Sequence, residues 1–233
     1  MPSSGAARSR CSTLVTDDFT DLGRWWREYA SAYAERTWRD YRALLAEAIR
    51  HAPGAPLLDV GCGYGFLVEC ARQFGMEAIG VEGAEDALAE CRARHPKADV
   101  RAWSAGTPLP VPSESVGVAV AHEVIDHITL EDNRALFGEI WRVLKPDGVV
   151  VVKSPSRYNT ADQDKGHVTF FSPAEFRGFL RSCHFEVVEQ PYVPRPLLGG
   201  SRLGWLAMQG LAKLWPREAW AARIDLVARR LPR

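Results

Sequence analysis

Short apolar runs of strand length alternate with longer amphipathic segments along most of this chain. The apolar runs fall at 57–60, 77–81, 98–103, 116–121, 148–153, 185–190 and 224–230. Segments whose apolar residues recur at helical spacing fall at 64–74, 84–94, 132–144 and 173–182. Because strands and helices that alternate in this way build a sheet with helices on both faces, we predict an α/β domain with a seven-stranded, mostly parallel sheet.

The start of the chain and one long connection depart from this alternation. Residues 1–16 are rich in Ser, Ala, Gly and Arg without periodicity, which predicts a disordered tail. We predict that residues 17–233 form a single domain, in which the aromatic-rich residues 17–52 make an N-terminal helical cap. Residues 192–223 separate the last two strands and carry apolar side chains at helical spacing, so we predict a helical insertion there.

A glycine-rich turn follows the first apolar run. Asp59 is followed by Gly61, Gly63 and Gly65 at alternate positions, and the first amphipathic segment begins there. Glycine adopts positive φ and has no Cβ, so the backbone of such a turn can approach a bound ligand closely. The second apolar run is followed by Glu82, where a carboxylate can accept hydrogen bonds from ribose hydroxyls. Together these features predict a nucleoside pocket.

The spacing of the glycines distinguishes between two classes of nucleoside ligand. A dinucleotide fingerprint would place glycine at position 66, where this chain has Phe66. The pattern D-x-G-x-G-x-G instead resembles the class I S-adenosylmethionine-dependent methyltransferases, and the likeness extends from about Leu57 to Val188. The resemblance implies a Rossmann-like sheet whose last strand is antiparallel, with S-adenosylmethionine as the cofactor. A nicotinamide oxidoreductase is the alternative that Phe66 disfavours.

The resemblance also implies which residues surround the cofactor. The first motif and the ribose-binding acid match Asp59, Gly61, Gly63, Gly65, Glu82 and, next to it, Gly83. The third motif places Ser104, Ala105 and Gly106 at the adenine, where the family usually has an acidic residue and this chain has none. Tyr33 on the cap and His122 after the fourth strand complete the expected set.

Three histidines are candidates for the catalytic base. A sulfonium methyl is already activated, so the protein has to align the acceptor atom and, for a hydroxyl, remove its proton. A neutral imidazole suits that task, and we expect His122, His127 or His167 to supply it. A structural role for His167 is the alternative. We predict no metal; the alternative is a divalent cation held by Glu123, Asp126 and His127 if their spacing forms one face of a helical turn.

Composition narrows the substrate and the compartment. The 233 residues are 46% hydrophobic and 25% charged, with zero formal net charge, so the chain lacks the basic character of a nucleic-acid binder. We therefore expect a small-molecule substrate. The five cysteines include no C-x-x-C pair, and neither a signal sequence nor a membrane-spanning run is evident, so we expect a cytoplasmic protein.

The insertion at 192–223 bears on the choice of acceptor. Its apolar side chains are Trp205, Leu206, Met208, Leu211, Leu214 and Trp215. We interpret it as a lid that selects a hydrophobic or amphiphilic acceptor, with surrounding Lys and Arg that could touch an anionic membrane. Core packing or a homodimer interface is the alternative.

The sequence resembles the branch with quinone-biosynthetic and secondary-metabolite enzymes, which implies methyl transfer to a hydroxyl or carboxyl oxygen of a small molecule. Methylation at nitrogen or carbon, or a cofactor-binding partner or sensor without catalysis, are the alternatives.

Overall fold

The structure, a computed structural model, describes residues 37–159, 167–191, 206–207, 210 and 221–233. The predicted tail, most of the predicted cap with Tyr33, and most of the insertion at 192–223 lie outside the described residues. Leu206, Ala207 and Gly210 are helical and exposed. No helix among the described residues is long and apolar enough to cross a membrane.

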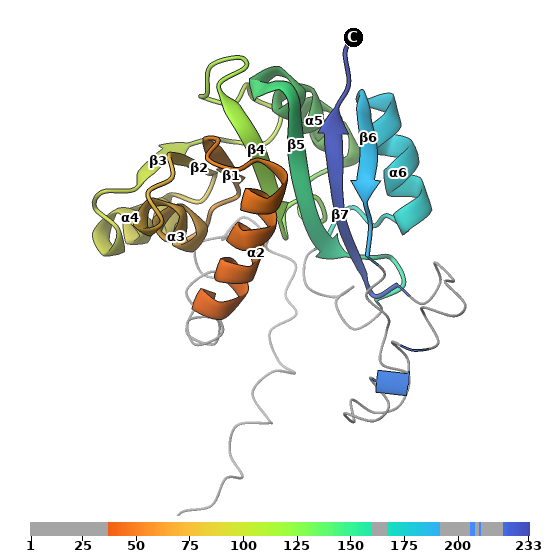
Figure 1. The fold of residues 1–233 in the computed structure, drawn as a ribbon, viewed down its shortest axis with the longest axis horizontal. Coiled ribbons are helices and arrows are strands. Elements are labelled where there is room, and N and C mark those ends of the chain that lie inside the picture. Colours follow the sequence, from red (N-terminus) through yellow and green to blue (C-terminus); the bar gives the residue numbers. More distant parts are fainter. Residues whose placement is uncertain (1–36, 160–166, 192–205, 208–209, 211–220) are drawn as a thin grey trace, which may run out of the picture.

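One sheet of seven strands forms the centre of the molecule (Figure 1). The strands are β1 (Leu57–Val60), β2 (Ala78–Glu82), β3 (Asp99–Ala102), β4 (Val116–His122), β5 (Leu144–Pro155), β6 (Phe185–Glu189) and β7 (Arg223–Arg230). Their order is β3-β2-β1-β4-β5-β7-β6, with β7 antiparallel to both of its neighbours. This confirms the Rossmann-like α/β sheet and the antiparallel last strand.

Helices cover both faces of this sheet (Figure 1). They are α2 (Thr37–His51), α3 (Phe66–Gln73), α4 (Glu85–Arg94), α5 (Leu130–Val143) and α6 (Pro173–Ser182). The helix α6 has the predicted bounds, and Ser172 and Glu175 form a reciprocal capping box at its start. The helix α5 begins two residues earlier than expected because the Thr129 side chain accepts a hydrogen bond from Asp132 N (3.1 Å) and caps it there.

Apolar cores on both faces of the sheet hold the layers together. Leu44, Leu45 and Ala48 of α2 pack on one face against α3 and the central strands. On the other face, Phe137 of α5 meets the rings of Phe176, Phe179 and Phe185 at centroid distances of 5.4–6.0 Å. Removing a ring so placed costs about 3–5 kcal/mol, so Phe137 anchors α5 and α6 to the sheet.

The start of β4 has room only for glycine at position 117. A Cβ at Gly117 would lie 2.3 Å from the Cβ of Ala55, in the loop that follows α2. The backbones are also joined there, because Gly117 N donates to Pro56 O (2.9 Å). A larger residue would push this loop away from β4.

Candidate functional site

The carboxyl ends of β1, β2, β4 and β5 meet at one edge of the sheet, and the glycine loop lies there. Gly61, Gly63 and Gly65 have φ values of 68°, 51° and 73°, a region that favours glycine. A Cβ at Gly61 would lie 2.5 Å from Val124 Cγ2, and one at Gly65 would lie 2.3 Å from Cys91 Sγ. Conformation and space both require glycine here. The helix α3 starts at 66, later than predicted, because Gly65 is left-handed.

The carboxylate of Glu82 joins this loop to the end of β2. Its Oε2 accepts from Gly63 N (2.9 Å), and its Oε1 accepts from Gly83 N (2.8 Å) and Ala84 N (2.9 Å). The residue is only 8% exposed. A carboxylate oxygen has two lone pairs, so Oε2 keeps the capacity to accept a ligand hydroxyl beside the glycine loop. The residue thus fits the ribose-binding role proposed for it.

Asp59 brings a second acid to the same place. Burial, and then the negative charge of Glu82, raise the pKa of Asp59 well above its ordinary value. A positively charged group bound nearby would favour the ionised form of this carboxyl. The pair of acids therefore suits a cationic nucleoside better than a second anion.

The segment expected at the adenine turns sharply at Gly106, which has a φ of 79°. A Cβ at Gly106 would come within 2.8 Å of Oδ1 of Asp132, in the first turn of α5. The turn is closed by Trp103 Nε1, which donates to Thr107 O (3.0 Å). Ser104 and Ala105 lie in this turn. An acidic side chain therefore lies beside the segment after all, and it comes from a helix that the local sequence could not indicate.

The described part of the cap brings an aromatic ring to the site. Tyr41 of α2 stacks on Phe66 (centroids 5.8 Å apart), the first residue of α3 after the glycine loop. Its ring also meets that of His122 edge-on (6.0 Å). The sequence pointed to Tyr33, which lies outside the described residues. Tyr41 shares helical spacing with buried Leu44 and Leu45, and that spacing was the available signal.

An acid–histidine cluster, made of Asp126, His127 and His167, lies beyond the end of β4. His167 Nε2 is 3.0 Å and His127 Nε2 is 3.7 Å from Oδ2 of Asp126, and the two imidazole rings are 4.7 Å apart. Ser154 at the end of β5 donates to Oδ1 of Asp126 (3.0 Å). Asp126 is 2% exposed, so almost all of its polar contacts are made within the protein.

The electrostatics of the cluster keep Asp126 ionised. Burial alone would raise the pKa of Asp126, but the hydrogen bond with His167 and the charges of His127 and His167 lower it below its ordinary value. An ionised carboxylate fixes the ring of an adjacent imidazole and stabilises its protonated form. The pair formed by Asp126 and His167 therefore has the arrangement of an oriented general base.

Backbone bonds bring residue 167 to a cluster forty positions earlier in the chain. Val168 N and Thr169 N both donate to Asp126 O (2.8 and 3.2 Å). Thr169 Oγ1 donates to Ile128 O (2.6 Å), and Arg157 holds the other side through Phe170 O (3.0 Å). The segment that follows His167 is thus fixed to the turn after β4 and to Arg157.

Glu123, Asp126 and His127 do not share one helical face, which was the condition for the alternative metal site. Residues 124–127 form an isolated turn, and Glu123 precedes it with a φ of 56°. Its carboxylate turns away to an ion pair with Arg223 at the start of β7. The ligand atoms that do lie within 4.8 Å of one another belong to Asp126, His127 and His167.

His122 is poorly suited to accept a proton. Burial, followed by the positive charges of Arg223 and Lys153, lowers the pKa of His122 to about 4. The imidazole is therefore uncharged at neutral pH and only weakly basic. His122 is the last residue of β4 and its ring contacts Tyr41, a place that fits a lining role at the cofactor.

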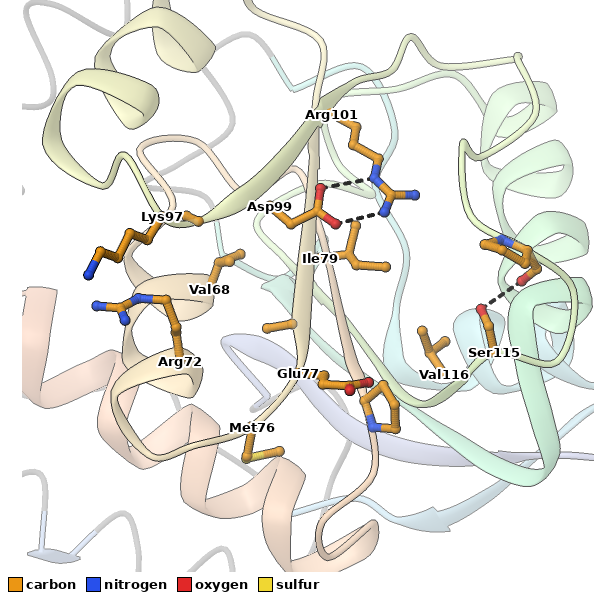
Figure 2. Close-up of a pocket in the computed structure, with 14 residues that line it drawn as sticks. Val68, Arg72, Met76, Glu77, Ile79, Lys97, Asp99, Arg101, Ser115 and Val116 are labelled. Atoms are coloured by element: carbon orange, nitrogen blue, oxygen red, sulfur yellow. Dashed lines mark hydrogen bonds and ion pairs between the residues drawn. The ribbon is translucent and has the colours of Figure 1, made fainter.

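A pocket of about 460 Å³ lies away from all of these residues, at the amino ends of the strands (Figure 2). Figure 2 shows Arg72 and Lys97 on one side and Asp99 joined to Arg101 on the other. Arg72 is already paired with Glu69 (2.7 Å). This pocket belongs to neither the glycine loop nor the acid–histidine cluster.

The strand order, the glycine loop after β1 and the acid after β2 define a nucleoside-binding α/β domain. Residues 58–152 match the family model described as a methyltransferase domain. A probable S-adenosylmethionine-dependent methyltransferase of Mycolicibacterium smegmatis is 30% identical over 159 residues, which are 66% of this chain and 61% of that protein. A ubiquinone biosynthesis O-methyltransferase of Bradyrhizobium sp. is 30% identical over 114 residues, 48% of this chain and 44% of that protein. The chain thus spans less than two thirds of the length of these relatives.

Solved structures share the fold at lower identity. One is a putative methyltransferase solved in complex with the Haloferax volcanii Trm112 methyltransferase activator. The alignment covers 91% of this chain and 98% of that chain, with a TM-score of 0.67 and 18% identity. The alignment with a SAM-dependent methyltransferase from Archaeoglobus fulgidus covers 87% of this chain and 100% of that chain, with a TM-score of 0.61 and 19% identity. The family match over residues 58–152, the named relatives and the shared fold together support a class I S-adenosylmethionine-dependent methyltransferase, with S-adenosylmethionine as the cofactor.

Proposed function

We propose that this protein transfers the methyl group of S-adenosylmethionine to a hydroxyl or carboxyl oxygen of a hydrophobic or amphiphilic small molecule. The observation that carries this proposal is the buried pair of Asp126 and His167 at the carboxyl edge, where a base can take a proton from an acceptor hydroxyl. The resemblance to a relative named as a ubiquinone biosynthesis O-methyltransferase supports oxygen as the acceptor atom.

In the proposed reaction the residues of this chain position the reactants and move one proton. The bound cofactor supplies an activated methyl group, and Glu82 with the glycine loop holds its nucleoside end. When the acceptor hydroxyl is methylated, its proton would pass to Nδ1 of His167. Asp126, facing Nε2 of that ring at 3.0 Å, stabilises the resulting imidazolium.

The same cluster suggests an alternative in which a divalent cation activates the acceptor. Asp126, His127 and His167 can each offer one ligand atom within 4.8 Å of the others. One carboxylate and two imidazoles make a poor set for Mg²⁺, which prefers oxygen ligands, and a better one for Zn²⁺ or Mn²⁺. We favour the base, and expect chelator to leave the rate unchanged. Loss of turnover in chelator, restored by one of these cations, would show the metal reaction instead.

A panel of acceptors tests the class of reaction. Matched aromatic compounds with a hydroxyl, a carboxyl or an amino group are incubated with the protein and S-adenosylmethionine, and release of S-adenosylhomocysteine is measured. We expect turnover with a hydroxyl or carboxyl compound. Turnover confined to amines would assign nitrogen methylation, and tight cofactor binding without turnover of any compound would favour a non-catalytic sensor or partner.

We assign selection of the acceptor to the insertion at 192–223, as its sequence suggests. The two strands that flank it meet the insertion on the acceptor side, where β6 ends at Glu189 and β7 starts at Arg223. Arg223 is paired there with Glu123. Deleting residues 196–220 and closing the gap with a short turn should abolish turnover of the acceptor and keep cofactor binding. Normal turnover in the shortened protein would contradict this role, and loss of cofactor binding together with solubility would indicate core packing.

A further inference from the structure

A partly buried ionic network joins the cap helix to the centre of the sheet. Lys153 Nζ lies 2.8 Å from Oε2 of Glu47 on α2 and 2.6 Å from Oδ1 of Asp225 on β7. The three side chains are 20%, 14% and 16% exposed. We call this the Lys153 network. It joins three elements that are more than seventy residues apart from one another along the chain.

The register of the strands places this network beside the site. Lys153 is paired with His122 across β4 and β5, and with Asp225 across β5 and β7. The helix α2 lies over these strands (Figure 1), and Tyr41 of the same helix meets His122. The network and the aromatic contact therefore fix α2 to the strands at two points.

The two carboxylates favour the charged form of Lys153. Burial would lower the pKa of Lys153, but the hydrogen bonds to Asp225 and Glu47 raise it above its ordinary value. A partly buried ammonium that is held by two carboxylates has few alternative positions, because moving it would leave a buried charge unpaired. The Lys153 network thus adds a link of defined geometry between α2 and the sheet to the apolar packing of Leu44, Leu45 and Ala48.

The position of Tyr41 follows from that of Glu47. The two residues are six positions apart on one continuous helix, which corresponds to about 9 Å along the axis. A shift of α2 at Glu47 therefore moves Tyr41 relative to Phe66 and His122. Phe66 directly follows the glycine loop, so Tyr41 lies between that loop and the end of β4.

We propose that the Lys153 network is a positioning device, which holds α2 so that the ring of Tyr41 closes the cofactor site between Phe66 and His122. The inference rests on the proposed function of the glycine loop. It adds Tyr41 as a residue that contacts the cofactor, and Glu47 and Lys153 as residues that position Tyr41. None of these was predicted from the sequence as part of the site.

The test compares two variants of the same helix by their affinity for S-adenosylhomocysteine. Glu47→Ala cuts the link to α2 but leaves Lys153 paired with Asp225, and we expect it to weaken binding about tenfold, because misplacement by a fraction of an ångström has effects of this size. The control is Arg50→Ala, one turn away, which breaks an exposed pair with Glu189 and should change affinity less than twofold. Should Glu47→Ala not fold, Glu47→Gln keeps its volume and removes the charge.

A double-mutant cycle separates positioning from general stability. We expect Tyr41→Leu to weaken binding about tenfold, and the variant with both Glu47→Ala and Tyr41→Leu to bind no more weakly than Tyr41→Leu alone. If Glu47→Ala leaves the affinity unchanged, or if the two losses multiply, Glu47 does not act through Tyr41 and the inference is overturned. If the unaltered protein does not bind S-adenosylhomocysteine, the proposed function itself fails, which is a distinct result.

Discussion

The glycine loop and the acid–histidine cluster occupy the same edge of the sheet but are built in different ways. The loop is shaped by backbone: Gly61, Gly63 and Gly65 have positive φ, and Glu82, seventeen residues after Gly65, accepts from the amides of Gly63 and Gly83. The cluster is assembled from side chains of three separate segments, in which Ser154 and His167 meet Asp126.

This difference teaches what each region tolerates. In the loop, a Cβ added at Gly61 or Gly65 has no room. In the cluster, none of the three residues has a positive φ, and we propose that the side chain of His167 acts as the base. Substitutions should therefore affect cofactor binding in one region and turnover in the other.

The largest effect should come from the cluster. His167→Ala removes the proposed base, so we expect kcat to fall about 1,000-fold with the hydroxyl acceptor found in the panel, while affinity for S-adenosylhomocysteine stays within about twofold. The matched control is Ser154→Ala, which removes a bond to the other oxygen of Asp126 and should lower kcat by no more than about tenfold. An unchanged kcat in His167→Ala would remove this histidine from the reaction.

The loop should respond in stability as well as in binding. Gly65→Ala puts a Cβ 2.3 Å from Cys91 Sγ at a φ of 73°, which we expect to lower the free energy of unfolding by about 3 kcal/mol. Urea unfolding measures this. Gly138→Ala in α5, where a Cβ would meet nothing within 4 Å, is the control and should be slightly stabilising. Equal losses in both variants would mean that the loop has no special need for glycine.

Removing the acid of the loop should have a smaller effect on affinity alone. Glu82→Gln replaces one acceptor oxygen by a donor, and a hydrogen bond to a charged group contributes about 1.5–3 kcal/mol, so affinity for S-adenosylhomocysteine should fall about tenfold or more. Glu77→Gln, before the start of the same strand and next to the pocket of Figure 2, is the control and should bind normally. Unchanged affinity in Glu82→Gln would contradict the ribose assignment.

The comparison also explains how far the sequence could be interpreted. A need for positive φ or for space is local, so Gly61, Gly63, Gly65 and the alternation of strands and helices could be predicted from the pattern alone, and the antiparallel last strand from the resemblance. The contacts of Asp126 with Ser154 and His167, and of Glu123 with Arg223, depend on tertiary structure, because no spacing rule brings such distant residues together. Asp132 beside Gly106 was missed for the same reason.

The smallest effect concerns a polar contact that is local to α3, just after the loop. Two bonds from Arg72 (both 2.7 Å), and one from Gln73 (3.0 Å), lower the pKa of Glu69 from 4.5 to about 2. A carboxyl whose pKa is lower in the folded than in the unfolded state stabilises the fold at pH values above its unfolded pKa. This contribution is lost as the pH falls from about 4.5 toward 2.

Because Arg72 is 41% exposed, screening reduces this contribution to about 1 kcal/mol. Glu69→Gln should therefore be about 1 kcal/mol less stable than the unaltered protein at pH 7, and the difference should shrink steadily below pH 4.5. Urea unfolding from pH 7 to pH 3 checks this. A difference that does not depend on pH would show that Glu69 stabilises α3 by packing and not by its charge.

Titration calorimetry with S-adenosylhomocysteine and, separately, with NAD tests the central claim that the glycine loop and Glu82 form a methyltransferase cofactor site. The arrangement of Asp59, Gly61, Gly63, Gly65 and Glu82, with Phe66 where a dinucleotide site has glycine, predicts one molecule of S-adenosylhomocysteine bound per chain and no binding of NAD. Binding of NAD without binding of S-adenosylhomocysteine would contradict it.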